Sequence, residues 1–115
     1  MSQTAGDLGP PRPPRSWRDS VVGVVTILRY RTEAAGASDN ARTIYDFRLQ
    51  VIDEAGKPHG IVGVELRGLG FEGGISEGDW VEIDRSARRR GEAFEISSLR
   101  NLTTGGDVKG RRFRF

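Results

Sequence analysis

Four arginines stand within six residues of this sequence, and a glycine follows them. The run comprises Arg85, Arg88, Arg89, Arg90 and Gly91. A guanidinium is always charged, and its planar fork of N–H donors matches the oxygens of a phosphate or a carboxylate. Only Asp84 and Glu92 stand close enough in sequence to offset the mutual repulsion of these cations. The cluster therefore predicts a loop that contacts an anion, although a solvated loop would also account for it.

The charge of the chain is distributed unevenly. The 115 residues carry a net charge of +2, but residues 20–84 hold six basic and eleven acidic groups, whereas residues 85–115 hold nine basic and three acidic groups. Such asymmetry favours an anionic partner for the C-terminal part. Sixteen of the eighteen basic residues are arginine, a bias that a GC-rich genome would also produce.

Two short alternating segments must position the arginine cluster. Gly78 and Asp79 are turn residues that precede the segment WVEID over residues 80–84, and AFEIS follows over residues 93–97. Apolar residues at every second position predict β-strands, and glycine marks the turns between them. The arginines therefore lie in a loop held out by a strand scaffold, a common arrangement for a contact surface.

The preceding residues predict three more strands. Residues 20–33 are rich in β-branched side chains, and Gly23 inside them indicates a bend or a bulge. Residues 43–53 alternate most clearly, and residues 61–67 form the third strand after a hairpin loop. The inward-facing residues are predicted to be Tyr45, Phe47, Leu49, Val51, Val62, Val64 and Leu66.

The linker over residues 68–77 contains four glycines, too many for a stable helix at about 1 kcal/mol each relative to alanine. Phe71 and Ile75 are predicted to fill the bottom of the core from this loop. With no helical periodicity elsewhere, residues 20–106 predict an all-β domain of five strands. So small a sheet hides its edges best by closing into a barrel.

Both ends of the chain are predicted to be flexible tails. Residues 1–19 are proline- and arginine-rich and read as disordered, except that Trp17 would either pack on the domain or meet a partner. Residues 107–115 read as an exposed basic and aromatic tail. Its characteristic residues are Arg111, Arg112, Phe113, Arg114 and Phe115.

Several classes of chemistry find no support in the sequence. There are no cysteines, so disulfides and thiolate metal sites are excluded. His59 is the only histidine and stands in a turn, and the carboxylates form no pair suited to acid–base catalysis. The glycines of residues 68–74 follow a strand but open no helix, so the nucleotide-loop signatures fail. We therefore expect no enzyme activity, no cofactor and no metal.

The longest apolar run, residues 21–28, is far shorter than the roughly 20 residues that cross a bilayer, and the N-terminus has no apolar signal segment. We therefore expect a soluble cytoplasmic protein.

Residues 20–105 resemble an OB-fold, the five-stranded Greek-key barrel that binds oligonucleotides or oligosaccharides. GISEGDWVEI is similar to the stretch that leads into the fourth strand of many such barrels, and EISSLRNLTTG is similar to fifth strands in members related to single-strand binding proteins and replication protein A. Two features depart from the family. A glycine-rich loop stands where a helix usually lies between strands three and four, and the body of the domain is acidic.

The resemblance implies a ligand lying across strands two and three, flanked by the loops that follow strands one and four. The implied ligand is single-stranded nucleic acid bound with low sequence specificity, with cations on its phosphates and aromatic side chains stacked on its bases. The residues expected to bind it are Arg29, Tyr30, Arg31, Arg48, Arg67, Trp80, Arg85, Arg88, Arg89, Arg90, Arg111, Arg112, Phe113 and Arg114.

Other interpretations fit the same residues. Arg48 and Arg67 stand in phase with Asp46 and Glu65, so cross-strand ion pairs would explain them without a ligand. Trp80 would equally cover apolar surface left open by the missing helix. The acidic body and the proline-rich N-terminus favour a protein-interaction or regulatory module within a larger assembly. Contact of the arginines with oligosaccharide or anionic lipid is a third alternative.

Overall fold

A computed structural model describes residues 9–34 and 41–111, and every regular element within them is a β-strand. The strands are β1 (Ser20–Ala34), β2 (Ala41–Ile52), β3 (Pro58–Gly68), β4 (Phe71–Glu72), β5 (Trp80–Asp84), β6 (Arg89–Arg90), β7 (Ala93–Ile96), β8 (Ser98–Asn101) and β9 (Asp107–Gly110). The predicted all-β class is confirmed for these residues. The glycine-rich linker contains the short strand β4 and no helix.

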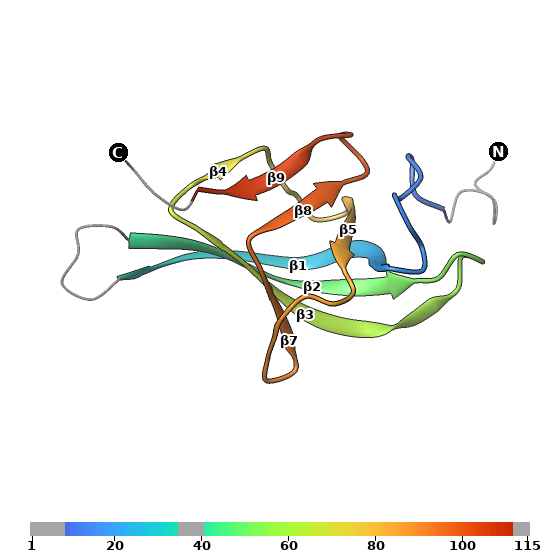
Figure 1. Cartoon of the computed structure of the whole chain (residues 1–115), viewed down its shortest axis with the longest axis horizontal. Coiled ribbons are helices and arrows are strands. Elements are labelled where there is room, and N and C mark those ends of the chain that lie inside the picture. The colour runs from blue at the N-terminus through green and yellow to red at the C-terminus, as the bar shows by residue number, and fades with distance from the viewer. Residues whose placement is uncertain (1–8, 35–40, 112–115) are drawn as a thin grey trace.

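All nine strands belong to one mixed sheet in the order β4-β9-β8-β5-β1-β2-β3-β7-β6. Neighbouring strands are antiparallel except for β3 and β7, which are parallel. The sheet is not closed, so the predicted five-stranded Greek-key barrel is not confirmed, although the fold is compatible with a barrel-like domain. Figure 1 shows the long strands β1, β2 and β3 crossing the molecule beneath the shorter strands β8 and β9.

The strand β1 changes its register part-way along its length. Its pairing with β2 shifts between Val25 and Ile27, which is a bulge. Just before the bulge, a Cβ on Gly23 would stand 2.8 Å from the carbonyl carbon of Gln50, so only glycine fits there. The bend predicted from Gly23 is therefore present two residues later. Because one residue is added, even-numbered residues face outward before the bulge and odd-numbered residues face outward after it.

The core lies on the inner side of the curved sheet. The alternation predicted for β2 and β3 is confirmed, since Phe47, Leu49, Val64 and Leu66 are all fully buried. Phe71 and Ile75 pack against this core from the linker, as predicted. The other buried members of the cluster are Val21, Val25, Val81, Ile83, Phe94, Ile96, Leu99 and Val108.

The chain from Asp107 to Gly110 is not an exposed tail, which corrects the sequence-based boundary. These residues form β9, which pairs with β8 and β4 and buries Val108 in the core. The chain turns back between β8 and β9. This turn depends on Asn101, whose side-chain oxygen accepts the N–H groups of Thr103 and Thr104 at 2.9 and 3.1 Å. Arg112, Phe113 and Arg114 lie outside the described residues, so their predicted role is untouched.

The N-terminal segment also differs from the expected disordered tail. From residue 9 onward it lies against the sheet, and Trp17 is half-buried. Arg12 donates hydrogen bonds to the carbonyl groups of Leu102 and Thr103. The segment is also attached through the buried carboxylate of Glu82 on β5, which accepts the N–H groups of Arg15 and Ser16. Residues 1–8 lie outside the described residues.

The close approach at Gly23 predicts a specific cost for adding a methyl group. Gly23→Ala should destabilise the protein by about 1–3 kcal/mol, because the new Cβ overlaps the backbone of Gln50. Gly74→Ala is the matched control, since a Cβ there meets nothing within 4 Å. Urea unfolding of both variants measures the difference. Equal stability of the two variants would contradict the close approach.

Candidate nucleic-acid interface

The outer side of the sheet carries a row of side chains that starts at Trp80. Val24 on β1 pairs with both Trp80 on β5 and Gln50 on β2, and Gln50 pairs with Ile61 on β3. Directly paired residues of antiparallel strands point to the same face. Trp80 therefore shares the outer face of the sheet with Gln50, and β1 lies between the two residues.

The next row combines cations with small residues. Arg48 on β2 pairs with Ile27 on β1 and with Gly63 on β3, and Gly63 pairs in turn with Ala93 on β7. Arg90 on β6 pairs with Ala93 and completes the row. Gly63 and Ala93 stand between Arg48 and Arg90 in this row. We call these two rows the outer band; it comprises Trp80, Val24, Gln50, Ile61, Ile27, Arg48, Gly63, Ala93 and Arg90.

Two isoleucines of the outer band are unusually open to solvent. Ile27 is 47% exposed and Ile61 is 58% exposed, and they belong to adjacent rows on β1 and β3. Large apolar side chains gathered on one exposed surface mark a contact site more often than those scattered singly. The outer band therefore offers apolar contact area beside cations.

An ion-pair network lies beside the outer band and centres on Arg67. The guanidinium of Arg67 is only 12% exposed and meets Glu65 at 2.7 Å, Glu95 at 3.1 Å and Glu33 at 3.3 Å. The hydrogen bond with Glu65 raises the pKa of Arg67 and, with the nearby carboxylates, outweighs the opposing effect of burial. Arg67 thus joins three strands, which favours the interpretation as cross-strand ion pairs rather than a ligand contact.

The network is close to neutral as a whole. Arg31 pairs with Glu33 at 3.3 Å and with Asp46 at 3.7 Å, both largely in solvent. With the arginine loop included, four guanidinium groups face four carboxylates. They are Arg31, Arg67, Arg88 and Arg90 against Glu33, Asp46, Glu65 and Glu95. Within residues 9–34 and 41–111, neither Arg29 nor Arg48 has an ion pair, so their charges remain available.

The arginine loop divides its cations between two roles. Arg85 donates to the carbonyl groups of Arg18 and Ser20 at 3.1 and 2.8 Å, which ties the loop to the start of β1. Arg88 and Arg90 are 82% and 63% exposed, and each lies 3.7 Å from Glu95. Such long, solvated pairs contribute little stability, so these two cations can turn to another anion at little cost.

A turn at the end of β5 sets the direction of this loop. The carboxylate of Asp84 accepts the hydroxyl of Ser86 at 2.7 Å and its N–H at 2.9 Å. These two hydrogen bonds, that of the hydroxyl first, hold the pKa of Asp84 below its usual range. The backbone of Ala87 then bonds to the carbonyl of Asp84, and Gly91 adopts a positive φ of 63° where the chain turns back. The loop is therefore a defined turn.

Tyr30 is separated from its neighbours Arg29 and Arg31. It pairs with Tyr45, on the opposite face from the two arginines, and their ring centres lie 5.7 Å apart. Tyr45 in turn meets Phe71 at 4.9 Å. Strand alternation splits the basic–aromatic–basic triplet, so Tyr30 does not join the outer band.

The chain matches no protein-family model, no curated protein and no solved structure. Among the described residues, no group of three or more His, Cys, Asp or Glu side chains could hold a metal ion. The same residues contain no helix that is long and apolar enough to cross a membrane.

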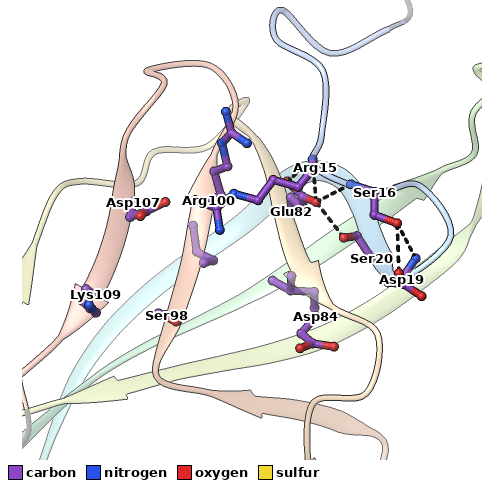
Figure 2. Close-up of a pocket in the computed structure, with 12 residues that line it drawn as sticks. Arg15, Ser16, Asp19, Ser20, Glu82, Asp84, Ser98, Arg100, Asp107 and Lys109 are labelled. Atoms are coloured by element: carbon purple, nitrogen blue, oxygen red, sulfur yellow. Dashed lines mark hydrogen bonds between the residues drawn. The ribbon is translucent and has the colours of Figure 1, made fainter.

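A cleft of about 470 Å³ lies where the N-terminal segment meets β5, β8 and β9 (Figure 2). At its wall, the buried carboxylate of Glu82 accepts the N–H groups of Arg15 and Ser16 at 3.0 and 3.3 Å and the hydroxyl of Ser20 at 2.6 Å. Arg100 and Lys109 also line the cleft, with several acids beside them. This arrangement fastens the N-terminal segment over the outer side of β5.

The outer band was only partly predictable from the sequence. Arg48, Arg90 and Trp80 were expected, and the structure places them in adjacent rows. Ile27 and Ile61 were missed, although Ile61 stands out of phase with the inward residues of its own strand. Arg111 was expected at the site but lies beside the linker, where its N–H bonds to the carbonyl of Gly70.

Removal of the negative charge at Glu82 should release the N-terminal segment. Glu82→Gln leaves one acceptor oxygen and adds an N–H₂ group facing N–H donors, so we expect a loss of about 1–3 kcal/mol in stability. Amide hydrogen exchange at Arg15 and Ser16 should accelerate at the same time. The exposed Glu72→Gln serves as control; unchanged exchange at both amides in Glu82→Gln would contradict this role.

The lowered pKa of Asp84 predicts a pH dependence of stability. An unfolded aspartate titrates near 3.9, so the contribution of Asp84 is fully present above about pH 4 and is lost as the pH falls through its lower folded pKa. Asp84→Asn should therefore flatten the acid limb of the stability curve below about pH 4. Ser86→Ala should move the pKa of Asp84, followed by carboxyl NMR, toward its ordinary value. An unchanged titration in Ser86→Ala would contradict the assignment.

Proposed function

We propose that this chain is a noncatalytic module that binds single-stranded nucleic acid, with low sequence specificity, across the outer band. The proposal rests on one observation. Adjacent rows of one sheet face hold Trp80, two exposed isoleucines and the cations Arg48 and Arg90. Single-strand binding combines a cationic track for phosphates with apolar and aromatic faces for bases. The outer band supplies both.

The connectivity of the sheet supports an OB-type barrel as the scaffold. Strands β7 and β8 are separated only by Ser97, yet β7 pairs with β3 and β8 pairs with β5. The run over residues 93–101 thus reaches both ends of the four-strand set β5-β1-β2-β3. We propose that this run acts as the fifth barrel strand, with β4, β6 and β9 as additions. The outer band then occupies the surface on which OB-type domains bind their ligands.

The neutral ion-pair network limits how strongly charge contributes to binding. Arg67 and Arg31 are compensated by carboxylates, so the available cations are Arg29, Arg48 and the solvated arginines of the loop. With about four phosphates neutralised, the logarithm of the binding constant should fall with a slope of about −3 against the logarithm of salt concentration. Binding therefore depends on apolar contact as well as on charge.

A protein-interaction module is the second candidate function. Ile27 and Ile61 are exposed beside an ion-pair network whose charges are compensated, and such a surface also suits a protein partner. Charge reversal of the outer-band cations distinguishes the two candidates. It should weaken the binding of a nucleic acid, which carries phosphates, and should have little effect on the binding of a neutral protein surface.

Charge reversal on the outer band tests the nucleic-acid proposal. Arg48→Glu combined with Arg90→Glu should weaken binding of a fluorescein-labelled deoxythymidine oligonucleotide at least about tenfold at low salt, because each reversal removes a charge-assisted contact. Fluorescence anisotropy at two salt concentrations measures both the affinity and the salt slope. Quenching of Trp80 fluorescence by the strand should be lost in parallel.

Lys57→Glu combined with Lys109→Glu makes the same change in net charge away from the outer band and is the matched control. Both double variants should unfold at urea concentrations close to that of the parent protein, since all four side chains are exposed. Equal losses in the two variants would indicate a nonspecific charge effect. Unchanged affinity of the Arg48 and Arg90 variant would reject the outer band as the binding surface.

A further inference from the structure

A second cleft lies at the end of the sheet where the β2–β3 turn meets the segment that precedes β1. Its volume of about 570 Å³ falls within the range of small-molecule sites, about 300–1,000 Å³. The cleft lies on the side of β6 that faces away from the outer band. Arg90 pairs with Ala93 on the outer band, whereas Arg89 pairs with the buried Phe94 and lines this cleft. Alternation along β6 thus sends neighbouring arginines to two different surfaces.

One wall of this cleft is cationic. The guanidinium of Arg89 lies 4.0 Å from the centre of the Phe94 ring, a cation–π contact that holds the charge in place. Arg85 is fixed by its hydrogen bonds to the carbonyl groups of Arg18 and Ser20, and the side chain of Arg18 is exposed beside it. All three arginines line the cleft. An anionic group would be favoured on this side.

The acidic wall of this cleft comes from the β2–β3 turn. Asp53 accepts the N–H of Lys57 at 2.8 Å and meets Nε2 of His59 at 2.8 Å. The backbone hydrogen bond from Lys57, followed by the contact with His59, holds the pKa of Asp53 below its usual range, so it is an anion at neutral pH. Glu54 stands beside it. This wall repels phosphate and accepts hydrogen bonds from hydroxyl or amino groups.

Apolar and aromatic side chains also line the cleft. Val62 and the ring of Phe94 line the cleft, and Trp17 lines it from the N-terminal segment. A flat ring system could be covered here by an aromatic side chain, a contact worth about 1–3 kcal/mol for a nucleic-acid base. The cleft therefore suits a ligand with an anionic end, a flat apolar body and hydrogen-bond donors on its far side.

We propose that this cleft binds a nucleoside 5′-phosphate unit. The phosphate lies toward Arg18 and Arg89, the base lies against Trp17, and the ribose hydroxyl groups donate to Asp53 and Glu54. Acidic side chains on ribose hydroxyl groups are a recurrent feature of nucleotide sites. The unit is either a free nucleotide or the phosphorylated end of a strand; the strand-end form rests on the proposed function, whereas the free form does not.

The test uses the full chain carrying Trp80→Phe, so that Trp17 is the sole tryptophan. Adenosine monophosphate should quench Trp17 fluorescence and shift the imidazole NMR signals of His59. Adenosine and inorganic phosphate should each bind at least about tenfold more weakly, since each lacks one of the two recognised ends. Arg18→Gln and Arg89→Gln should each weaken the monophosphate about tenfold.

Arg18→Gln changes an exposed side chain and leaves the stacked pair of Arg89 and Phe94 intact, so it keeps the test valid if Arg89→Gln unfolds. Arg48→Glu with Arg90→Glu is the matched control and should leave monophosphate binding unchanged. Loss of oligonucleotide binding in that control, with the monophosphate retained, supports both sites separately. Failure of every oligonucleotide to bind the parent chain would reject the proposed function without touching this cleft.

Oligonucleotides with and without a 5′-phosphate distinguish the two sources. A tighter complex with the phosphorylated strand, abolished by Arg18→Gln, supports the strand end; equal affinity of both strands with bound monophosphate supports the free nucleotide. The proposal is overturned if millimolar monophosphate leaves both Trp17 fluorescence and the His59 signals unchanged. It is also overturned if adenosine binds as tightly as the monophosphate, because the cationic wall would then play no part.

Discussion

The surface of this domain depends on one close approach of two strands. At Gly23 the backbone of β1 comes so near to Gln50 on β2 that no side chain fits between them, and the register shifts two residues later. Without that shift, Ile27, Arg29 and Arg31 would face inward and Leu28 would face solvent. Ile27 in the outer band, and Arg31 and Glu33 in the ion-pair network, therefore owe their direction to the bulge. β1 pairs with β5 over its first five residues and with β2 along most of its length.

A second constraint is the short parallel pairing of β3 with β7. Only four residues of each strand pair, and parallel pairing is slightly weaker per residue than antiparallel pairing. Arg67 compensates for this, because it reaches Glu95 on β7 as well as Glu65 on its own strand and Glu33 on β1. A nearly buried guanidinium is costly unless carboxylates surround it, and removal of one partner leaves the others uncompensated. In the sequence, the acidic body of the domain looks unfavourable for nucleic-acid binding. Some of its carboxylates, however, hold β3 and β7 together through Arg67.

The sequence predicts more of the strands than of the surfaces. Period-two alternation identifies residues 80–84 as a strand with the observed bounds, and it identifies the buried faces of β2 and β3, because burial on one face imposes that pattern directly. It does not predict β9, since Asp107–Gly110 is too short and too polar to stand out until Asn101 folds the chain back. Nor does the alternation distinguish the surroundings of Arg67 from those of Arg48. Both alternate with acids along their strands, and only the three-strand pairing shows that Arg67 is enclosed by carboxylates and Arg48 is not. The bulge explains why Ile27 was missed, because a single added residue reverses which side of β1 each later side chain occupies.

The arrangement of Arg88, Arg89 and Arg90 shows how a simple run of like residues acquires distinct functions. In an unstructured loop the three charges would be equivalent and their repulsion would favour a spread of conformations. The turn at Asp84 and the two-residue strand β6 remove that equivalence, since alternate residues of a strand face opposite sides. Arg88 and Arg90 reach Glu95 beside the outer band, while Arg89 lies over Phe94 at the end of the core. The repulsion that makes the cluster conspicuous in the sequence is thereby relieved through distance and through different partners. Two neighbouring surfaces each receive cations from one turn, so the proposed polyanion on the outer band and the proposed phosphate in the cleft would contact different side chains of the same short loop.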